Sequence, residues 1–353
     1  IEAGFRKAGI TPLHGEARFI GRDTITLNGE TLRAKHFHIA TGARPMTLDI
    51  PGEDLLTTST EFLELPARPD RIAFVGGGFI AMEFAHITQR AGASAVTVLE
   101  MAGRPLGPFD ADLVAMLVEA SVDLGIDVQT EAKVLKVEKQ GDEFAVSYET
   151  PSGIQVLTCD LVVHATGRVP NIDPLNLSAA GVEAGKRGIK VDAAMRTTNP
   201  AIFAAGDCAD SGLNLTPVSA YEGRIAGKNL LAGKDARLVS YPPVPSVVFT
   251  LPPVATVGLS EDAATEKGLK FDTRFEKTSG WYSSMRVGAS RSGFKVLVEQ
   301  ETGLILGAHL IGPGAEEQIN LFAMAMGAGL TANQIKAMIF AYPSYASDIG
   351  SMV

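Results

Sequence analysis

The stretch from Arg71 to Glu100, RIAFVGGGFIAMEFAHITQRAGASAVTVLE, constrains the fold of this chain more than any other. An apolar run ends at the glycine triplet Gly76-Gly77-Gly78, a helical pattern of apolar residues follows, and a second apolar run ends on Glu100. This order predicts a strand, a tight turn, a helix and a second strand, the unit that binds the pyrophosphate of a dinucleotide.

Each small residue of the motif has a physical reason. Gly76 allows the sharp turn out of the strand, and Gly78 lacks a Cβ, so the backbone can approach a pyrophosphate. Ala81 stands in the place of the usual third glycine and still permits close packing of helix on strand. The helix begins with Phe79 and Ile80, and its N-terminus directs unpaired N–H groups and a positive dipole end at the phosphates. The alternative is a glycine-rich turn with a purely structural role.

Glu100 follows Gly78 by about 20 residues, the spacing expected for a carboxylate that accepts hydrogen bonds from the ribose hydroxyls. A carboxylate there repels a 2′-phosphate, so the sequence favours NADH over NADPH. Arg104 lies close behind Glu100 and leaves NADPH open as the less favoured coenzyme.

Composition limits the classes of function. The 353 residues carry a net charge of −9 with no basic run, which argues against nucleic-acid binding. No apolar run reaches the ~18 residues of a membrane span. The two cysteines, Cys159 and Cys208, form no C-x-x-C, which indicates a reducing, cytoplasmic compartment. The six histidines show no metal spacing; His36 and His38 share one face of a strand but are too few for a zinc site.

The remaining pattern predicts several domains. An antiparallel meander precedes residue 38, and Asp110 caps a predicted helix over 111–123 that leads into further short strands. A helix begins at Thr216-Pro217, and from Tyr241 the chain becomes proline-punctuated β-structure followed by helices, the last opened by a capping box at Thr331. Pro45 to Gly52 and Val169 to Asn171 are expected to be extended linkers. The expected domain ranges are 1–71, 72–168, 169–240 and 241–353.

Six segments, taken together and in order, carry a family resemblance: VGGGFIAMEFA, HATGRVPN, IFAAGDCAD, LTPVSAYEGRIAGKNL, VVFTLPPVATVGLSE and TGLILGAHLIGPGAEE. The chain resembles the flavin-dependent pyridine nucleotide–disulfide oxidoreductases over nearly its whole length. The resemblance implies an α/β fold with Rossmann-like FAD/NAD(P)-binding domains and a C-terminal α+β dimerisation domain. Residues 1–71 and 169–240 would then belong to the FAD-binding domain, 72–168 to the NAD(P)-binding domain and 241–353 to the dimerisation domain.

The resemblance also implies flavin contacts. Asp207, after Gly206, is similar to the carboxylate that holds the flavin ribityl chain, with a turn-capping aspartate as the alternative. Thr216-Pro217 is similar to the helix start that faces flavin O2. Thr41-Gly42 and Thr166-Gly167 resemble the two turns beside the flavin and nicotinamide dinucleotides.

Two residues of the central helix receive roles in the same way. Phe79 stands at the position of the family's gate over the flavin face, although it could instead be a core residue of the first helical turn. Glu83 matches the glutamate that pairs with a lysine near flavin N5, although it could instead be a solvated helix residue.

The chain departs from the family at both ends. The first β-α-β unit of the FAD domain and the C-x-x-x-x-C helix, which also carries the lysine partner of Glu83, do not precede Ile1; we expect a truncated chain, with a natural protein that never had the unit as the alternative. At the other end Tyr342 replaces the family's general acid–base histidine and Ser347 replaces its glutamate, with Asp348 one position later. Tyr342 is expected to donate a proton or to be a packed aromatic.

The expected function is that of a homodimeric, FAD-dependent NADH oxidoreductase that passes hydride to flavin and then electrons to a disulfide or another small-molecule acceptor. Within that reading, direct transfer to a quinone or to oxygen competes with disulfide reduction. The alternative outside it is an NAD-binding dimeric fragment without tightly bound flavin. Dimerisation is expected through the C-terminal domain.

Overall fold

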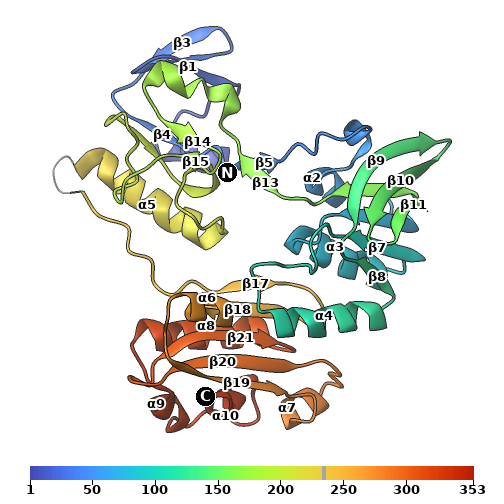
Figure 1. Ribbon diagram of the computed structural model, residues 1–353. Helices are drawn as coiled ribbons and strands as arrows, with labels where there is room; N and C mark the ends of the chain where they lie inside the picture. Colours follow the sequence, from blue (N-terminus) through green and yellow to red (C-terminus); the bar gives the residue numbers. More distant parts are fainter. Residues whose placement is uncertain (233–235) are drawn as a thin grey trace. The chain divides into compact units, whose positions relative to one another are not determined.

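The computed structural model describes residues 1–232 and 236–353, which form two compact units (Figure 1). The first unit combines residues 1–46 with 168–240, and the second combines residues 47–167 with 241–353. Each unit is therefore assembled from two separate segments of the chain. Both mix helices with sheets, as the sequence predicts for the fold class.

The first unit contains two helices, α1 and α5, several short 3₁₀ turns and four small sheets. Its elements are α1 (Glu2–Lys7), β1 (Ala17–Gly21), β2 (Thr24–Leu27), β3 (Glu30–Arg33), β4 (Phe37–Ile39), β5 (Ala43–Pro45), β13 (Arg168–Pro170), η2 (Asp173–Leu175), η3 (Leu177–Ala180), β14 (Ala184–Gly185), β15 (Gly188–Ile189), β16 (Ile202–Ala204), η4 (Gly206–Cys208) and α5 (Thr216–Ala232).

The centre of the first unit is the parallel pair β4–β16, against which α5 packs. The predicted meander is confirmed as the antiparallel sheet β1–β2–β3. Its second turn places Asn28 and Gly29 at φ 51° and φ 85°, the left-handed values that a two-residue hairpin loop requires. Apolar side chains from both segments, among them Phe19, Ile39 and Ile202, close one core.

The two predicted linkers are wrong as linkers in part. Ala43–Pro45 and Arg168–Pro170 pair antiparallel as β5 and β13, with Pro45 opposite Arg168. The Arg168 guanidinium also donates to the Ala43 carbonyl. The sequence could not reveal this pairing because prolines usually mark edges or breaks of strands, and here each proline ends a two-stranded ribbon that has no central position.

The second unit holds three sheets and most of the helices. Its elements are η1 (Glu53–Leu55), α2 (Ser59–Leu63), β6 (Arg71–Val75), α3 (Phe79–Arg90), β7 (Ala95–Leu99), α4 (Ala111–Asp123), β8 (Ile126–Gln129), β9 (Lys133–Gln140), β10 (Glu143–Thr150), β11 (Gly153–Cys159), β12 (Leu161–His164), β17 (Ser246–Val248), β18 (Val254–Gly258), α6 (Glu261–Glu266), β19 (Phe271–Lys277), α7 (Tyr282–Met285), β20 (Gly293–Glu299), β21 (Ile305–Ile311), α8 (Ala315–Gly327), α9 (Ala332–Lys336), η5 (Tyr345–Asp348) and α10 (Ile349–Met352).

A four-stranded parallel sheet in the order β12-β6-β7-β8 carries the glycine motif. The strands read as continuous apolar runs because both faces are covered: α3 packs against β6 and β7, α4 packs against β8, and the antiparallel sheet β9–β11 shares a second core with β6 and β12. Val75, His164 and Leu99 stand level in neighbouring strands. The carboxyl ends of β6, β7 and β12 therefore meet at one edge.

The C-terminal part of the second unit is a five-stranded antiparallel sheet in the order β17-β18-β21-β20-β19, with α8 on β18 and β21. Three predicted helix caps are confirmed. Asp110 accepts from the Asp112 and Leu113 N–H groups, Ser260 accepts from Ala263, and Thr331 forms a capping box with Gln334.

The parallel and antiparallel sheets of the second unit are joined through α4 (Figure 1). Leu113 and Leu117 of α4 share a core with Val248, Val254 and Ile311 of the C-terminal part. This shared core is the reason that residues 72–168 and 241–353, expected as separate domains, lie in one compact unit. The proposed domain boundaries thus divide the chain by expected cofactor role rather than by packing.

Ion pairs reinforce the same junction. The side chain of Lys295 in β20 is 5% exposed, and its Nζ lies 3.0 Å from Asp110 Oδ2, 2.5 Å from Asp112 Oδ2 and 3.0 Å from Glu261 Oε2. Burial disfavours the charged lysine, but hydrogen bonds to the three carboxylates outweigh it and raise the pKa of Lys295 above its ordinary value. Among the described residues, no helix is long and apolar enough to cross a bilayer.

Candidate functional site

The three glycines of the turn after β6 are glycines for different reasons. Gly76 has φ +99°, and a Cβ there would lie 2.6 Å from the Ala165 carbonyl oxygen. A Cβ on Gly77 would lie 2.7 Å from Glu100 Oε2 and 2.9 Å from Glu100 Cβ. The fold itself therefore excludes a side chain at these two positions.

Gly78 is different, because the protein does not fill the space beside it. It has an ordinary φ of −75°, and a Cβ there would meet only the Ala165 carbonyl oxygen, at 3.8 Å. Gly78 is also the N-cap of α3 and supplies no side-chain cap, and the first turn of α3 holds no acidic residue. The first N–H groups of a helix have no intrahelical partner, so this end of α3 offers donors to an anion.

Glu100 is fixed at the tip of β7 by two backbone donors. Gly77 N–H donates to Oε2 at 2.5 Å and Ala102 N–H donates to Oε1 at 2.7 Å. A carboxylate has about four acceptor positions, so each oxygen retains capacity for a ligand hydroxyl.

Arg104 does not point its charge into a free position. Its guanidinium donates to the carbonyls of Leu106, Gly107 and Phe109 at 3.3, 2.7 and 3.0 Å. These bonds use the guanidinium to order the loop between β7 and α4. The residue that kept NADPH open in the sequence is thereby engaged elsewhere.

The turn Thr166-Gly167 follows β12 and lies beside the glycine turn, since a Cβ on Gly76 would come within 2.9 Å of Thr166 Cα. Phe79 is 54% exposed, so the alternative of a core residue is wrong for it. Ile80 is half-buried and packs against the core of the second unit. The predicted residues Gly76, Gly77, Gly78, Phe79, Ile80, Glu100 and Gly167 thus gather around one edge of one sheet.

Glu83 lies one turn further along α3. It is half-buried, and its Oε1 accepts the Phe249 N–H at 2.9 Å. Burial raises the pKa of the Glu83 carboxyl, against the lowering effect of that hydrogen bond. The solvated-residue alternative therefore does not describe this side chain.

The predicted flavin residues gather in the first unit. β4 and β16 run parallel, so Thr41-Gly42, which follows β4, and Gly206-Asp207, which follows β16, share one edge of that sheet. Ser219 Oγ of α5 donates to Asp207 Oδ1 at 3.2 Å. Thr216 and Pro217 are exposed in the first turn of α5.

A buried carboxylate that the sequence analysis missed supports this turn. Glu222 of α5 is 0% exposed, and its Oε2 accepts the Gly206 N–H at 2.8 Å. Gly206 has φ +73°, and a Cβ there would lie 3.1 Å from the Ser219 side chain. The only sequence signal was an acidic residue on the apolar face of a helix, which by itself does not name a partner.

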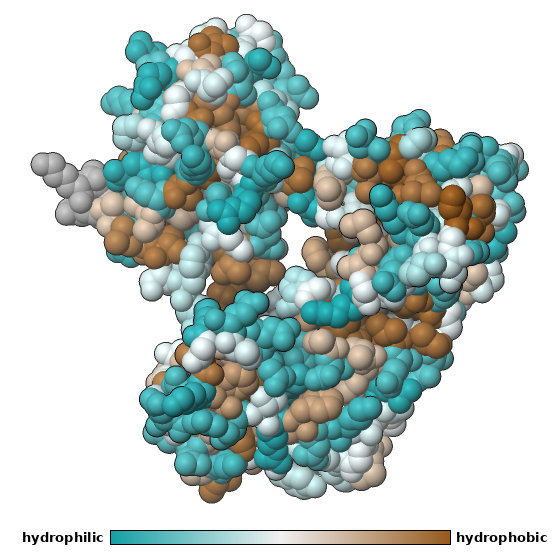
Figure 2. All heavy atoms as spheres, viewed as in Figure 1, coloured by the Kyte–Doolittle hydropathy of each residue, from teal (hydrophilic) through white to brown (hydrophobic). Residues whose placement is uncertain are grey.

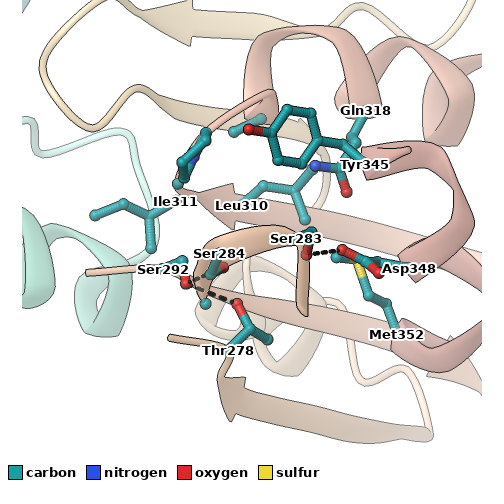
Figure 3. A pocket seen from close by; sticks show the side chains of 14 residues that line it. Thr278, Ser283, Ser284, Ser292, Leu310, Ile311, Gln318, Tyr345, Asp348 and Met352 are labelled. Atoms are coloured by element: carbon teal, nitrogen blue, oxygen red, sulfur yellow. Dashed lines mark hydrogen bonds between the residues drawn. The ribbon is translucent and has the colours of Figure 1, made fainter. Parts of the chain in front are cut away.

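Tyr342 is 73% exposed, and its ring lies 5.9 Å from that of Tyr282. Asp348 is linked to α7 by the Ser283 hydroxyl, which donates to its Oδ2; burial raises the pKa of the Asp348 carboxyl, and this hydrogen bond lowers it. Figure 3 shows Ser283 and Asp348 together in a polar recess that Tyr345 and Gln318 also line. Tyr342 and Asp348 both line a second recess on the other side of Ser283.

Neither cysteine is placed for redox chemistry within the described chain. Cys208 is 0% exposed and lies against the Ile39 and Ala205 carbonyls. Cys159 is 1% exposed, and burial raises the pKa of its thiol to about 11. In the part of the chain that is described, no group of His, Cys, Asp and Glu side chains could hold a metal ion.

Comparisons with known proteins extend the resemblance. Residues 1–223 match the family model described as pyridine nucleotide-disulphide oxidoreductase, and residues 244–353 match that of the dimerisation domain of the same family. A mercuric reductase of Bacillus cereus is 34% identical over 344 residues, which are 97% of this chain and 54% of that protein. A glutathione reductase of Pisum sativum is 33% identical over 348 residues, 98% of this chain and 62% of that protein.

A solved structure, described as an HOCl-induced flavoprotein disulfide reductase, RclA, from Escherichia coli, agrees with the fold at a TM-score of 0.90 and 28% identity. The match covers 99% of this chain and 81% of that one. The chain therefore spans only a little over half of the length of the mercuric reductase, but nearly all of its own residues are matched.

Proposed function

Because the chain belongs to the pyridine nucleotide-disulphide oxidoreductase family, we propose that it forms part of a flavin-dependent oxidoreductase that takes hydride from NADH. The observation that carries the proposal is the open space at Gly78, beside the uncapped start of α3. Packing does not require glycine there, whereas a pyrophosphate lying on the helix N-terminus does.

The residues around this space fit NADH. Glu100 would accept hydrogen bonds from the ribose hydroxyls through the acceptor positions that Gly77 and Ala102 leave open. Its negative charge opposes a 2′-phosphate, and Arg104 is held by backbone carbonyls instead of offering a counter-charge. Thr166-Gly167 would border the nicotinamide end of the site.

The first unit fits the flavin half of the proposal. Asp207 keeps one carboxylate oxygen beyond the contact with Ser219 and would hold ribityl hydroxyls. Glu222 fixes the turn that presents Asp207, and Thr216-Pro217 opens a helix of 17 residues whose dipole favours negative charge at its start. When bound, the flavin would accept hydride from NADH and pass electrons to a disulfide or another acceptor.

The acceptor side is proposed to use Tyr342. At the ordinary pKa of ~10 a tyrosine is protonated near neutral pH, so Tyr342 would donate a proton rather than take one. Its exposed position leaves the hydroxyl accessible to an acceptor.

The C-terminal part is proposed to form a homodimer. Figure 2 shows apolar residues reaching the surface in separate groups among polar ones. The exposed large apolar side chains of residues 241–353 are concentrated on three segments, and they include Tyr282, Met285, Val287, Met324, Met338, Ile339 and Tyr342. A second copy would bury such side chains, which are costly to leave in water.

The test uses the full-length protein that contains this chain, purified after reconstitution with FAD. We expect flavin absorption bands that bleach on anaerobic addition of NADH, and a KM for NADH about tenfold below that for NADPH, equivalent to about 1.4 kcal/mol. Glu100→Ala should narrow that ratio, while Glu149→Ala, an exposed carboxylate in β10, should not change it. A colourless protein that does not retain FAD, or a preference for NADPH, would contradict the proposal.

A further inference from the structure

Two residues on one face of α3 hold the same downstream segment by its backbone. Glu83 and His86 are three positions apart, so their side chains are neighbours on the helix. Phe249 N–H donates to Glu83 Oε1 at 2.9 Å, and Leu251 N–H donates to His86 Nδ1 at 3.2 Å. Alternate residues of an extended segment face the same side, which is why 249 and 251 both reach α3.

The His86 ring is fixed from its other side as well. It is 0% exposed, and its Nε2 lies 2.9 Å from Ser121 Oγ in α4. The Ser121 hydroxyl donates to the Leu117 carbonyl at 2.8 Å, so its oxygen is free to accept from His86. With Nδ1 accepting from Leu251, the proton belongs on Nε2, and every polar atom of the ring has one partner.

This arrangement keeps His86 neutral. Burial lowers the pKa of His86 to about 4, so the ring carries no charge near pH 7. The charged neighbours on α3 are Glu83 and Arg90, whereas α4 and the 249–251 segment present a hydroxyl, carbonyls and N–H groups to the ring. A neutral, fully bonded and immobile ring is suited to positioning a backbone rather than to moving protons.

We propose that His86 is a positioning residue for hydride transfer: by anchoring Leu251 it holds the Phe249 N–H on Glu83 and so fixes that carboxylate at the nicotinamide end of the site. This inference rests on the proposed NADH site. Without the His86 contact, the 249–251 segment would be tied to α3 only through Glu83, a half-buried group on the first turns of the helix. Small displacements of groups that position a reacting ring lower rates strongly.

The experiment compares His86→Leu with His86→Asn in the flavin-loaded full-length protein. Leucine fills the space but accepts nothing, while the asparagine Oδ1 lies near the position of Nδ1 and can accept the Leu251 N–H. The matched control is His309→Leu, another buried histidine of the same unit, bonded to Thr256 and the Leu259 carbonyl.

Two readouts are needed. Hydrogen exchange followed by mass spectrometry reports the amides of residues 249–251, and anaerobic stopped-flow absorbance reports flavin reduction by NADH. We expect His86→Leu to speed exchange at these amides and to slow flavin reduction, each by about tenfold. His86→Asn should restore most of both, and His309→Leu should change neither while losing comparable thermal stability.

The outcomes separate the two levels of the proposal. Flavin that NADH does not reduce in the unmodified protein would refute the proposed function. Normal reduction in both the unmodified protein and His86→Leu, or faster exchange spread evenly over the whole unit, would refute only the positioning role. Should His86→Leu not fold, Ser121→Ala provides the test, because it frees the ring at Nε2 and should shift both readouts in the same direction by less.

Discussion

The buried ammonium group of Lys295 supports a quantitative prediction. It is the one cation that contacts Asp110, Asp112 and Glu261 in the described structure, and it joins β20 to α4 and α6. Lys295→Met keeps much of the apolar stem but removes the charge. Asp110, whose side chain is 4% exposed, would then be a buried carboxylate without its cation.

The expected cost follows from the difference in exposure among the carboxylates. Removing one partner of a buried ion pair costs about 3–5 kcal/mol. Asp112 and Glu261 are 55% and 42% exposed, so water compensates them and adds little. The loss should therefore lie near the low end, about 3 kcal/mol. It should shrink as pH falls from 7 toward 4, because an unpaired buried carboxyl has a raised pKa and takes up a proton more readily in the folded state.

Urea unfolding followed by tryptophan fluorescence measures this loss, since Trp281 is the sole tryptophan and its ring lies 5.7 Å from Phe294, next to Lys295. The matched control is Lys136→Met, which removes an exposed pair with Glu138 and should cost less than about 1 kcal/mol. Adding Asp110→Asn, which can still cap α4, should recover part of the loss. A Lys295→Met cost no larger than that of the control, or one independent of pH, would refute the reasoning.

The glycine turn and the buried histidine give further tests. Gly76→Ala should lower the melting temperature, because its Cβ would lie 2.6 Å from a backbone oxygen at φ +99°, whereas Gly78→Ala should leave the melting temperature unchanged and weaken NADH binding measured by calorimetry. Equal effects of the two substitutions on stability would contradict the assignment of the open space to a ligand. His86 has its folded pKa lowered from 6.5 to about 4, so between these values the unfolded chain binds a proton that the folded chain does not. The free energy of unfolding should fall as pH drops through this window, by at most about 3 kcal/mol, and His86→Leu should flatten that slope in urea titrations; an unchanged slope would contradict it.

Local sequence rules predicted the local structure well. The glycine turn, the helix after it and the capping residues Asp110, Ser260 and Thr331 follow from contacts within a few positions, and the structure has each of them. The fold class followed from the order of motifs. The site residues remain predictions in their roles, although the structure gathers them at two strand edges.

Long-range contacts could not be predicted in the same way. His86 meets an N–H 165 positions later in the chain, and Glu222 meets one 16 positions earlier through a turn, so periodicity identifies the buried face but not the partner. The shared core of α4 with Val254 and Ile311 was missed for a similar reason, since apolar helix positions do not state which sheet they cover. The pairing of β5 with β13 needed the three-dimensional course of two segments that look like linkers.

The two-segment construction of the first unit has a consequence for biosynthesis. Phe37 in β4 pairs with Ile202 in β16, so this contact waits until the ribosome has added the 165 residues between the two positions in the numbering. At ~5–20 residues per second that is roughly 8–33 s, during which residues 47–167 emerge and can already collapse. A nascent chain arrested before residue 202 would display β4 without this partner strand.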